Sequence, residues 1–372
     1  MSDKVNFSLL FVLALVVLYL GFSGPANVLG ASFGMGDFVS SFSSSGGSSR
    51  GNVSLLASAA SVIEGAPSTQ TGRFLISFDT LRNVYPAAVS SQKGSLRVYD
   101  VTVNTHTRPD TLYVSTNQGL YYSDSTGLTW RVFASANGEL GAGSVVLRVI
   151  PAGGPNAYIV SVFQNETGYV YYTPDAFVTF KQLMSFNGEG AYDLSLYGNV
   201  LYAGMSNGQL IQYRMDTGTL RVSETFSSPI VRLYNTGDGF FYVFLKSGTL
   251  LQAASPAGEF QKISLKSGWF SSGSMRSVSF ASSGDIYALG KDGVYRSQNY
   301  GVTFELLNKI PLLEKQVDAV GVLGNTVYVM SAGRMYVSAD GGDSWKLQDD
   351  IPTNFVVSQF YFLGGGRVIL SE

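Results

Sequence analysis

The sequence predicts an all-β fold, and three observations carry this prediction. A strand-like segment centred on a tyrosine recurs six times, at intervals of 45, 44, 40, 45 and 41 residues. Short Gly-bearing turns such as Asn207-Gly208 and Asp292-Gly293 separate the segments, and glycine accepts the positive φ of tight hairpins. The repeats contain no convincing helical segment, so each period fits one four-stranded blade of a β-propeller. The repeated tyrosines are Tyr113, Tyr158, Tyr202, Tyr242, Tyr287 and Tyr328.

The repeats predict seven blades. Six complete units have second strands that begin near residues 112, 158, 201, 241, 286 and 327. A seventh unit, with strands starting near Phe355 and Gly366, lacks its two outer strands when the chain ends. The segments 73–78 and 82–89 can supply them, because N- and C-terminal strands that share a blade close a ring and remove its exposed edges. Six or eight blades remain alternatives if 73–89 forms something else.

The first 70 residues precede the repeats and predict export. Lys4 is followed by an apolar run from Leu9 to Leu20 and by Pro25, and residues 28–31 resemble a signal-peptidase site. We expect 1–30 to be either a cleaved signal peptide or a single membrane anchor that leaves the body of the chain outside the cytoplasm. Residues 31–70, rich in Gly and Ser at 34–52, form a linker, and 71–372 form the propeller.

Composition excludes several function classes. The formal net charge is −2, so no general attraction to nucleic acid is expected. Without cysteine there can be no disulfide, thiolate zinc site or cysteine nucleophile. His106 is the only histidine and falls in a turn between two strands, which argues against a catalytic triad and a histidine metal site. We therefore expect no metal and no cofactor.

A second motif lies in the turns between third and fourth strands. The segment Ser338-Ala-Asp-Gly-Gly-Asp-Ser-Trp345 is a full S/T-x-D-x-G-x-T/S-W box, and three degenerate copies are in phase with it. The domain resembles the Asp-box (BNR) propellers, closest in style to photosystem II assembly-factor-like proteins and to sortilin- and sialidase-type propellers. The carboxylate or amide caps the turn and the aromatic residue packs beneath it, so we expect a structural role. The motif positions are Ser338, Asp340, Gly342 and Trp345; Ser123, Ser125, Gly127 and Trp130; Ser297, Asn299, Gly301 and Phe304; and Thr173, Asp175 and Phe180.

The resemblance implies that the chain could be a glycoside hydrolase of the sialidase or xyloglucanase type, but the residues expected of such an enzyme are mostly lacking. The Arg-Ile-Pro motif that opens sialidase domains does not occur. A glycosidase needs two carboxylates across the channel, and acidic residues in the expected loops are few. They are Glu139, Glu189, Glu314, Asp349 and Asp350. No catalytic residue is assigned, and a glycoside hydrolase remains the alternative to a non-enzymatic protein.

Alignment of the first strands reveals a column of charge, here named the channel ring. Its members recur 39 to 48 residues apart on what should be the innermost strands. Neighbouring Asp and Arg could simply pair with one another. Alternatively, Arg232 and Arg276, with Arg148 opposite, could hold a carboxylate or an acidic peptide end. The ring consists of Asp100, Arg148, Asp193, Arg232, Arg276, Asp318 and Gln359.

Trp269 and Phe270 form a second candidate surface, on a small-residue loop that joins two blades at the mouth assigned to the ring. Aromatic side chains on such a loop either pack between blades or bind a sugar or a peptide. Together these features predict an exported, possibly membrane-tethered propeller that binds a protein or glycan at one face. An envelope structural protein is a further alternative, and the oligomeric state is left open.

Overall fold

The computed structural model divides the chain into two compact units, residues 1–70 and 71–372. It describes residues 74–77, 84–86, 96–107, 110–124, 130–141, 143–236, 239–265, 274–307, 310–311, 317–348, 359–364 and 367–371. The predicted signal or anchor segment and the linker lie outside these residues. Among the described residues, no helix is long and apolar enough to cross a membrane.

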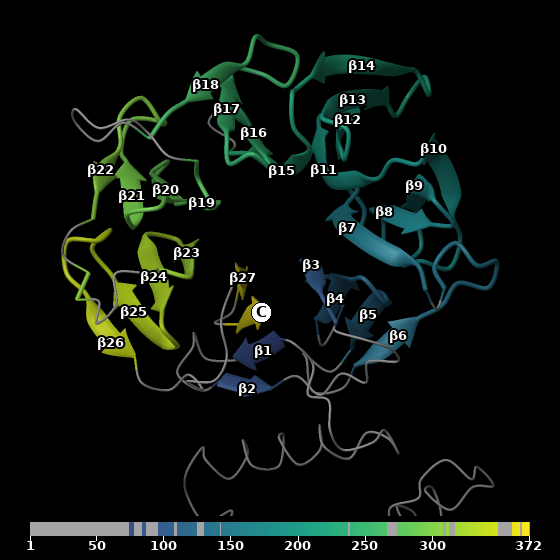
Figure 1. Ribbon diagram of the computed structural model, residues 1–372. Coiled ribbons are helices and arrows are strands. Elements are labelled where there is room, and N and C mark those ends of the chain that lie inside the picture. The colour runs from purple at the N-terminus through teal and green to yellow at the C-terminus, as the bar shows by residue number, and fades with distance from the viewer. Residues whose placement is uncertain are drawn as a thin grey trace, which may run out of the picture. The chain divides into compact units, whose positions relative to one another are not determined.

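Within 71–372 the described strands form seven four-stranded antiparallel sheets arranged around a common centre (Figure 1). The innermost strands are β3 (Val98–Asn104), β7 (Val145–Pro151), β11 (Ala191–Tyr197), β15 (Ile230–Asn235), β19 (Ser277–Phe280), β23 (Ala319–Leu323) and β27 (Gln359–Gly364). Their partners are β4 (Thr111–Thr116), β8 (Tyr158–Gln164), β12 (Val200–Met205), β16 (Phe241–Leu245), β20 (Ile286–Leu289), β24 (Thr326–Ser331) and β28 (Arg367–Ser371).

Two further strands complete each sheet. The third strands are β5 (Gly119–Ser123), β9 (Thr167–Thr173), β13 (Gln209–Arg214), β17 (Leu250–Ala253), β21 (Val294–Ser297), β25 (Arg334–Ser338) and β1 (Phe74–Ser77). The outer strands are β6 (Arg131–Phe133), β10 (Lys181–Asn187), β14 (Leu220–Thr225), β18 (Gln261–Ile263), β22 (Glu305–Leu306), β26 (Lys346–Gln348) and β2 (Val84–Pro86). The fold is therefore an all-β β-propeller of four-stranded blades.

Six blades are each a continuous run of four strands, whereas the seventh sheet is composite, with the order β2-β1-β28-β27. Strand β1 pairs with β28 in the register Phe74↔Ser371 and Ser77↔Val368, which is the pairing of chain ends that the repeat pattern predicts. Strand β27 of this sheet contacts both β23 and β3, the innermost strands of the last and first continuous blades.

The tyrosine column forms part of the core between blades. All six rings are at most 6% exposed, and Tyr113 and Tyr158 of neighbouring blades meet edge to face at 5.4 Å between ring centroids. The hydroxyl of Tyr287 donates to the carbonyl oxygen of Gly341 in the next blade at 3.2 Å. Burial of these rings removes a large apolar area from water and holds adjacent sheets face to face.

Candidate functional site

The channel ring is positioned by β-bulges in four innermost strands. In β3, β7, β11 and β15 the pairing with the second strand shifts register one residue before the ring side chain. A bulge places two residues opposite one and re-aims the side chain that follows it. Asp100, Arg148, Asp193 and Arg232 thereby occupy the same position in four consecutive blades.

These four side chains form one connected ionic network. The guanidinium of Arg148 pairs with Asp100 through Nη1 and with Asp193 through Nε, the latter at 2.6 Å. Asp193 is fully buried and also accepts from the backbone N–H of Leu194 at 2.9 Å and of Leu233 at 2.7 Å. Each oxygen of this carboxylate therefore has a donor, which is the condition under which a buried charge is tolerated.

Arg232 completes the network across the channel. Its Nη2 donates to the carbonyl oxygen of Tyr99 at 2.7 Å, and Tyr99 lies within the bulge of β3. Burial by itself lowers the pKa of Arg232, but attraction to Asp193 and Asp100 outweighs it, so the pKa lies above its usual value. The two carboxylates and two guanidiniums balance in charge.

The remaining ring residues lie outside this network. Arg276, which is exposed, donates through Nη2 to the carbonyl oxygen of Val317 in the next blade. Asp318 accepts from the backbone N–H of Ala332 at 3.0 Å, in the turn after β24. Gln359 accepts from the hydroxyl of Tyr361 at 3.0 Å. Each guanidinium of the suggested anion site therefore has a partner within the chain: Arg148 pairs with two carboxylates, and Arg232 and Arg276 each donate to a backbone carbonyl oxygen.

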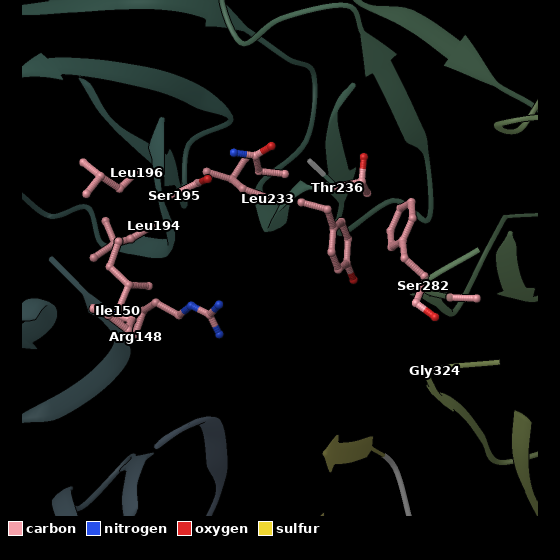
Figure 2. Close-up of a pocket in the computed structure, with 14 residues that line it drawn as sticks. Arg148, Ile150, Leu194, Ser195, Leu196, Leu233, Thr236, Ser282 and Gly324 are labelled. Atoms are coloured by element: carbon pink, nitrogen blue, oxygen red, sulfur yellow. The ribbon is translucent and has the colours of Figure 1, made fainter. Parts of the chain in front are cut away.

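A cavity of about 660 Å³ lies in the channel beside this network (Figure 2). Arg148 lines it, and Figure 2 shows its guanidinium projecting toward the centre. In the blades that contain β7, β11, β15 and β19, every lining residue other than Arg148 comes after the ring residue in the sequence, either on the innermost strand or in the turn that follows it. They are Ile150, Pro151, Leu194, Ser195, Leu196, Leu233, Tyr234, Asn235, Thr236, Phe280, Ala281 and Ser282, and Gly324 joins them from the turn after β23.

The cavity extends away from the mouth at which the sequence placed its candidate surfaces. The sequence placed the ring at the mouth formed by loops that join blades, together with Trp269 and Phe270, which lie outside the described residues. The cavity instead extends from Arg148 toward the turns between first and second strands. Because strands within a blade are antiparallel, the turns between third and fourth strands lie at this same end.

Those third-to-fourth-strand turns share one hydrogen-bond pattern. In the full box the hydroxyl of Ser338 accepts from the backbone N–H of Gly342 at 2.7 Å, and Asp340 accepts from that of Ser344 at 2.8 Å. The same two contacts, at 2.8–2.9 Å, occur in the turns that begin at Thr173 and Ser297. The Ser344 contacts hold the pKa of Asp340 well below its usual range. All these contacts are internal to the turn.

The aromatic ends of the boxes pack beneath the turns. Phe304 is 3% exposed and Trp130 7% exposed, Phe180 is half-buried, and Trp345 donates from Nε1 to the carbonyl oxygen of Gly342 at 3.0 Å. In the first copy Ser123 is buried, while Ser125 and Gly127 lie outside the described residues.

Of the other residues considered for catalysis, those that the structure describes are not among the residues that line the cavity. His106 is exposed in the turn after β3, where its backbone N–H donates to Asn104. Glu139 accepts from Ser135 at 2.8 Å, and Glu189 accepts from Ser206. Glu314, Asp349 and Asp350 lie outside the described residues. Over the ranges that the structure describes, no group of three or more His, Cys, Asp or Glu side chains could hold a metal ion.

Sequence reasoning located the ring but missed the cavity. Its lining consists of ordinary strand-end residues such as Leu196, Thr236 and Ser282, which carry no motif. The available signal was the position along the strand: in four blades, residues one to six places after the ring residue contribute to the lining. The bulges were also missed, because the partial apolar alternation of these strands hides a one-residue register shift.

The fold and channel thus define a β-propeller of four-stranded blades with a cavity on its axis. No family model matches the chain, and no curated protein is similar in sequence. YCF48 bound to a D1 peptide superposes with a TM-score of 0.56 at 14% identity, over 74% of this chain and 91% of that one. YCF48 from Cyanidioschyzon merolae gives the same score and identity over 74% and 95%. The extracellular domain of BT4673 from B. thetaiotaomicron gives 0.52 at 13%, over 74% and 37%. At these identities the likeness establishes the propeller fold.

Proposed function

We propose that this chain is a non-enzymatic, protein-binding propeller that acts outside the cytoplasm. The observation that carries the proposal is the cavity of about 660 Å³, a size typical of ligand sites, whose lining mixes aliphatic, hydroxyl and amide side chains around one guanidinium. A rigid ring of blades presents such a cavity at little entropic cost. A peptide complex of YCF48, a propeller of similar fold, supports a protein partner.

Export and attachment are part of this proposal. The apolar run from Leu9 to Leu20 and the Gly/Ser-rich stretch after it suit an N-terminal signal or anchor followed by a flexible tether. We also propose that the composite sheet closes the ring as its seventh blade, and that the turns at Thr173, Ser297 and Ser338 are Asp-boxes of a divergent member of that family. Contacts of β27 with β3 and β23 support the closure.

A binding role fits the chemistry of the ring better than glycoside hydrolysis does. A glycosidase needs one carboxyl group that carries a proton and a second that attacks or activates water. Asp100 and Asp193 both pair with the guanidinium of Arg148. Neither carboxylate is among the residues that line the cavity, so neither is placed to act on a substrate there.

Site-specific photo-cross-linking in the native cells tests the proposal. A photoreactive residue replaces Ser283, which is exposed in the turn after β19 at the cavity end of the ring, in the full-length chain. The control carries it at Ser185, which is exposed on outer strand β10. We expect a discrete adduct with one extracytoplasmic or membrane protein from Ser283 and none from Ser185. Absence of a protein adduct at Ser283, or turnover of an oligosaccharide by the purified chain, would contradict the proposal.

A further inference from the structure

The cavity is already neutral before any ligand enters. Arg148 is the one charged side chain among the described residues that line it, and its charge is countered by Asp100 and Asp193. A carboxylate placed here would meet these two buried acids behind the guanidinium. Because the two carboxylates already balance the two guanidiniums of the network, the cavity offers no net positive charge to an anionic ligand.

Arg148 nevertheless retains a directed donor. Its Nη1 donates to Asp100 and its Nε lies 2.6 Å from Oδ1 of Asp193 without the geometry of a hydrogen bond, whereas no contact of Nη2 is found among the described residues. The Arg148 side chain is 24% exposed, and its guanidinium projects into the cavity (Figure 2). A guanidinium fixed on two sides presents its remaining N–H groups in one orientation, which suits a neutral carbonyl or amide oxygen.

The apolar part of the lining is suited to aliphatic side chains. Ile150, Leu194 and Leu233 line the cavity from three consecutive innermost strands, and Ile150 and Leu194 lie nearest to Arg148 in Figure 2. The aromatic residues of the wall are engaged with one another: Tyr234 and Phe280 lie 4.6 Å apart between ring centroids, and Phe280 contacts Tyr242 at 4.8 Å. Sugar sites rely on open aromatic faces, so this wall favours a peptide over a glycan.

The mouth of the cavity adds groups that can pair with a peptide backbone. Ser195 and Thr236 supply hydroxyls and Asn235 an amide, all among the lining residues. The hydroxyl of Thr236 already donates to the carbonyl oxygen of Phe240 at 3.3 Å, so it offers a peptide N–H an acceptor, while the hydroxyl of Ser195 can both donate and accept.

We propose that the channel cavity binds a neutral, extended peptide segment of the partner protein, with a carbonyl or side-chain amide oxygen on Arg148 and aliphatic side chains on the flanking leucines. This assignment rests on the proposed protein-binding function and specifies its ligand. It differs from the carboxylate or acidic peptide end that the arginines alone had suggested.

A peptide-selection experiment on the full-length chain in detergent tests this assignment. The probe is a pool of capped pentapeptides with aliphatic second and fourth residues and a central Asn, Gln, Ser or Thr. A matched pool has a central Asp or Glu, and a panel of neutral oligosaccharides represents glycans. We expect affinity-selection mass spectrometry to enrich the neutral pool at least ten-fold over the acidic pool, with no retention of sugars.

Two variants locate the binding. Ser195→Trp fills the cavity from β11, and Ser185→Trp places the same side chain on the exposed outer strand β10. Peptide retention should fall at least ten-fold in Ser195→Trp and stay unchanged in Ser185→Trp, with thermal unfolding showing that both are folded. Preference for acidic peptides, retention of oligosaccharides, or equal retention by the two variants would overturn the assignment. If the adduct from Ser283 persists in Ser195→Trp, the cavity assignment fails while the proposed function stands.

Discussion

Asp193 is the residue at which the ionic network can be tested most sharply. Its two oxygens accept from the backbone N–H groups of Leu194 and Leu233, it forms an ion pair with Arg148, and it is fully buried. In Asp193→Asn one oxygen is replaced by an NH₂ group, which then faces another N–H donor. Removal of one partner from a buried ion pair costs about 3–5 kcal/mol; here Arg148 keeps Asp100, but two guanidiniums are left with a single carboxylate between them. We expect a loss of that size in the free energy of unfolding.

Asp318→Asn is the matched control, because Asp318 occupies the same ring position in another blade. It is half-buried, and its described contact is one backbone N–H, from Ala332 at 3.0 Å. The amide oxygen of Asn can keep that contact, so the cost should stay within about 1 kcal/mol. Urea denaturation followed by fluorescence measures both values, provided that the m-values agree. Losses that are equal within 1 kcal/mol would refute the network as the element that joins the innermost strands.

Three further predictions concern the turns and the core. Asp340→Asn should make the loss of stability in acid less steep below pH 4. The pKa of Asp340 is lower in the folded than in the unfolded chain, so its carboxylate contributes stability that is present above the unfolded-state pKa and lost as the pH falls through the folded-state pKa. Asn299 shows that an amide fits the equivalent turn. Burial raises the pKa of Tyr113 and of Tyr287 to about 12. Each tyrosine should therefore contribute about 3 kcal/mol to the free energy of unfolding below pH 10, and this contribution should be lost between pH 10 and 12. Denaturation at stepped pH measures the loss. Phe177 is buried and has a φ of +71°, a backbone conformation that glycine adopts without strain and alanine does not. Phe177→Gly should therefore destabilise the fold less than Phe177→Ala, although it removes more atoms. The opposite order would exclude backbone strain at this site.

The repeat pattern predicts most of the fold because each blade repeats the same physical requirements. A buried tyrosine on the second strand and a Gly-bearing hairpin recur at a fixed period, and both are visible in the residues themselves. The pairing of β1 with β28 could also be predicted, since the last repeat lacks two strands and an unpaired edge is unfavourable. Here local pattern and global topology agree.

The details of the site could not be predicted in the same way. The bulges before Asp100, Arg148, Asp193 and Arg232 arise from pairing between strands, and no residue type marks them. Sequence alignment placed Arg232 beside Arg276, but it could not show that Arg232 reaches across the channel to β3.

One turn departs from its motif for a reason that is likewise three-dimensional. Phe177 occupies the position at which Gly301 and Gly342 stand in the equivalent turns, and all three have positive φ. A Cβ at Gly301 or Gly342 would come within 2.6–2.7 Å of Ile263 or Leu307. Phe177 instead packs at 5.0 Å between ring centroids on Tyr113 and on Tyr158, and this burial offsets the strained backbone.

Mapping of the cross-linked residue in the partner is the most direct test of the central claim, which is that the channel cavity receives a protein segment. With the photoreactive group at Ser283 of the full-length chain in its native cells, mass spectrometry of the adduct identifies the attached peptide. We predict a single uncharged, aliphatic-flanked segment of one protein, with no adduct from Ser185. Adducts scattered over many proteins, an adduct with a glycan, or the same adduct from both positions would contradict the claim.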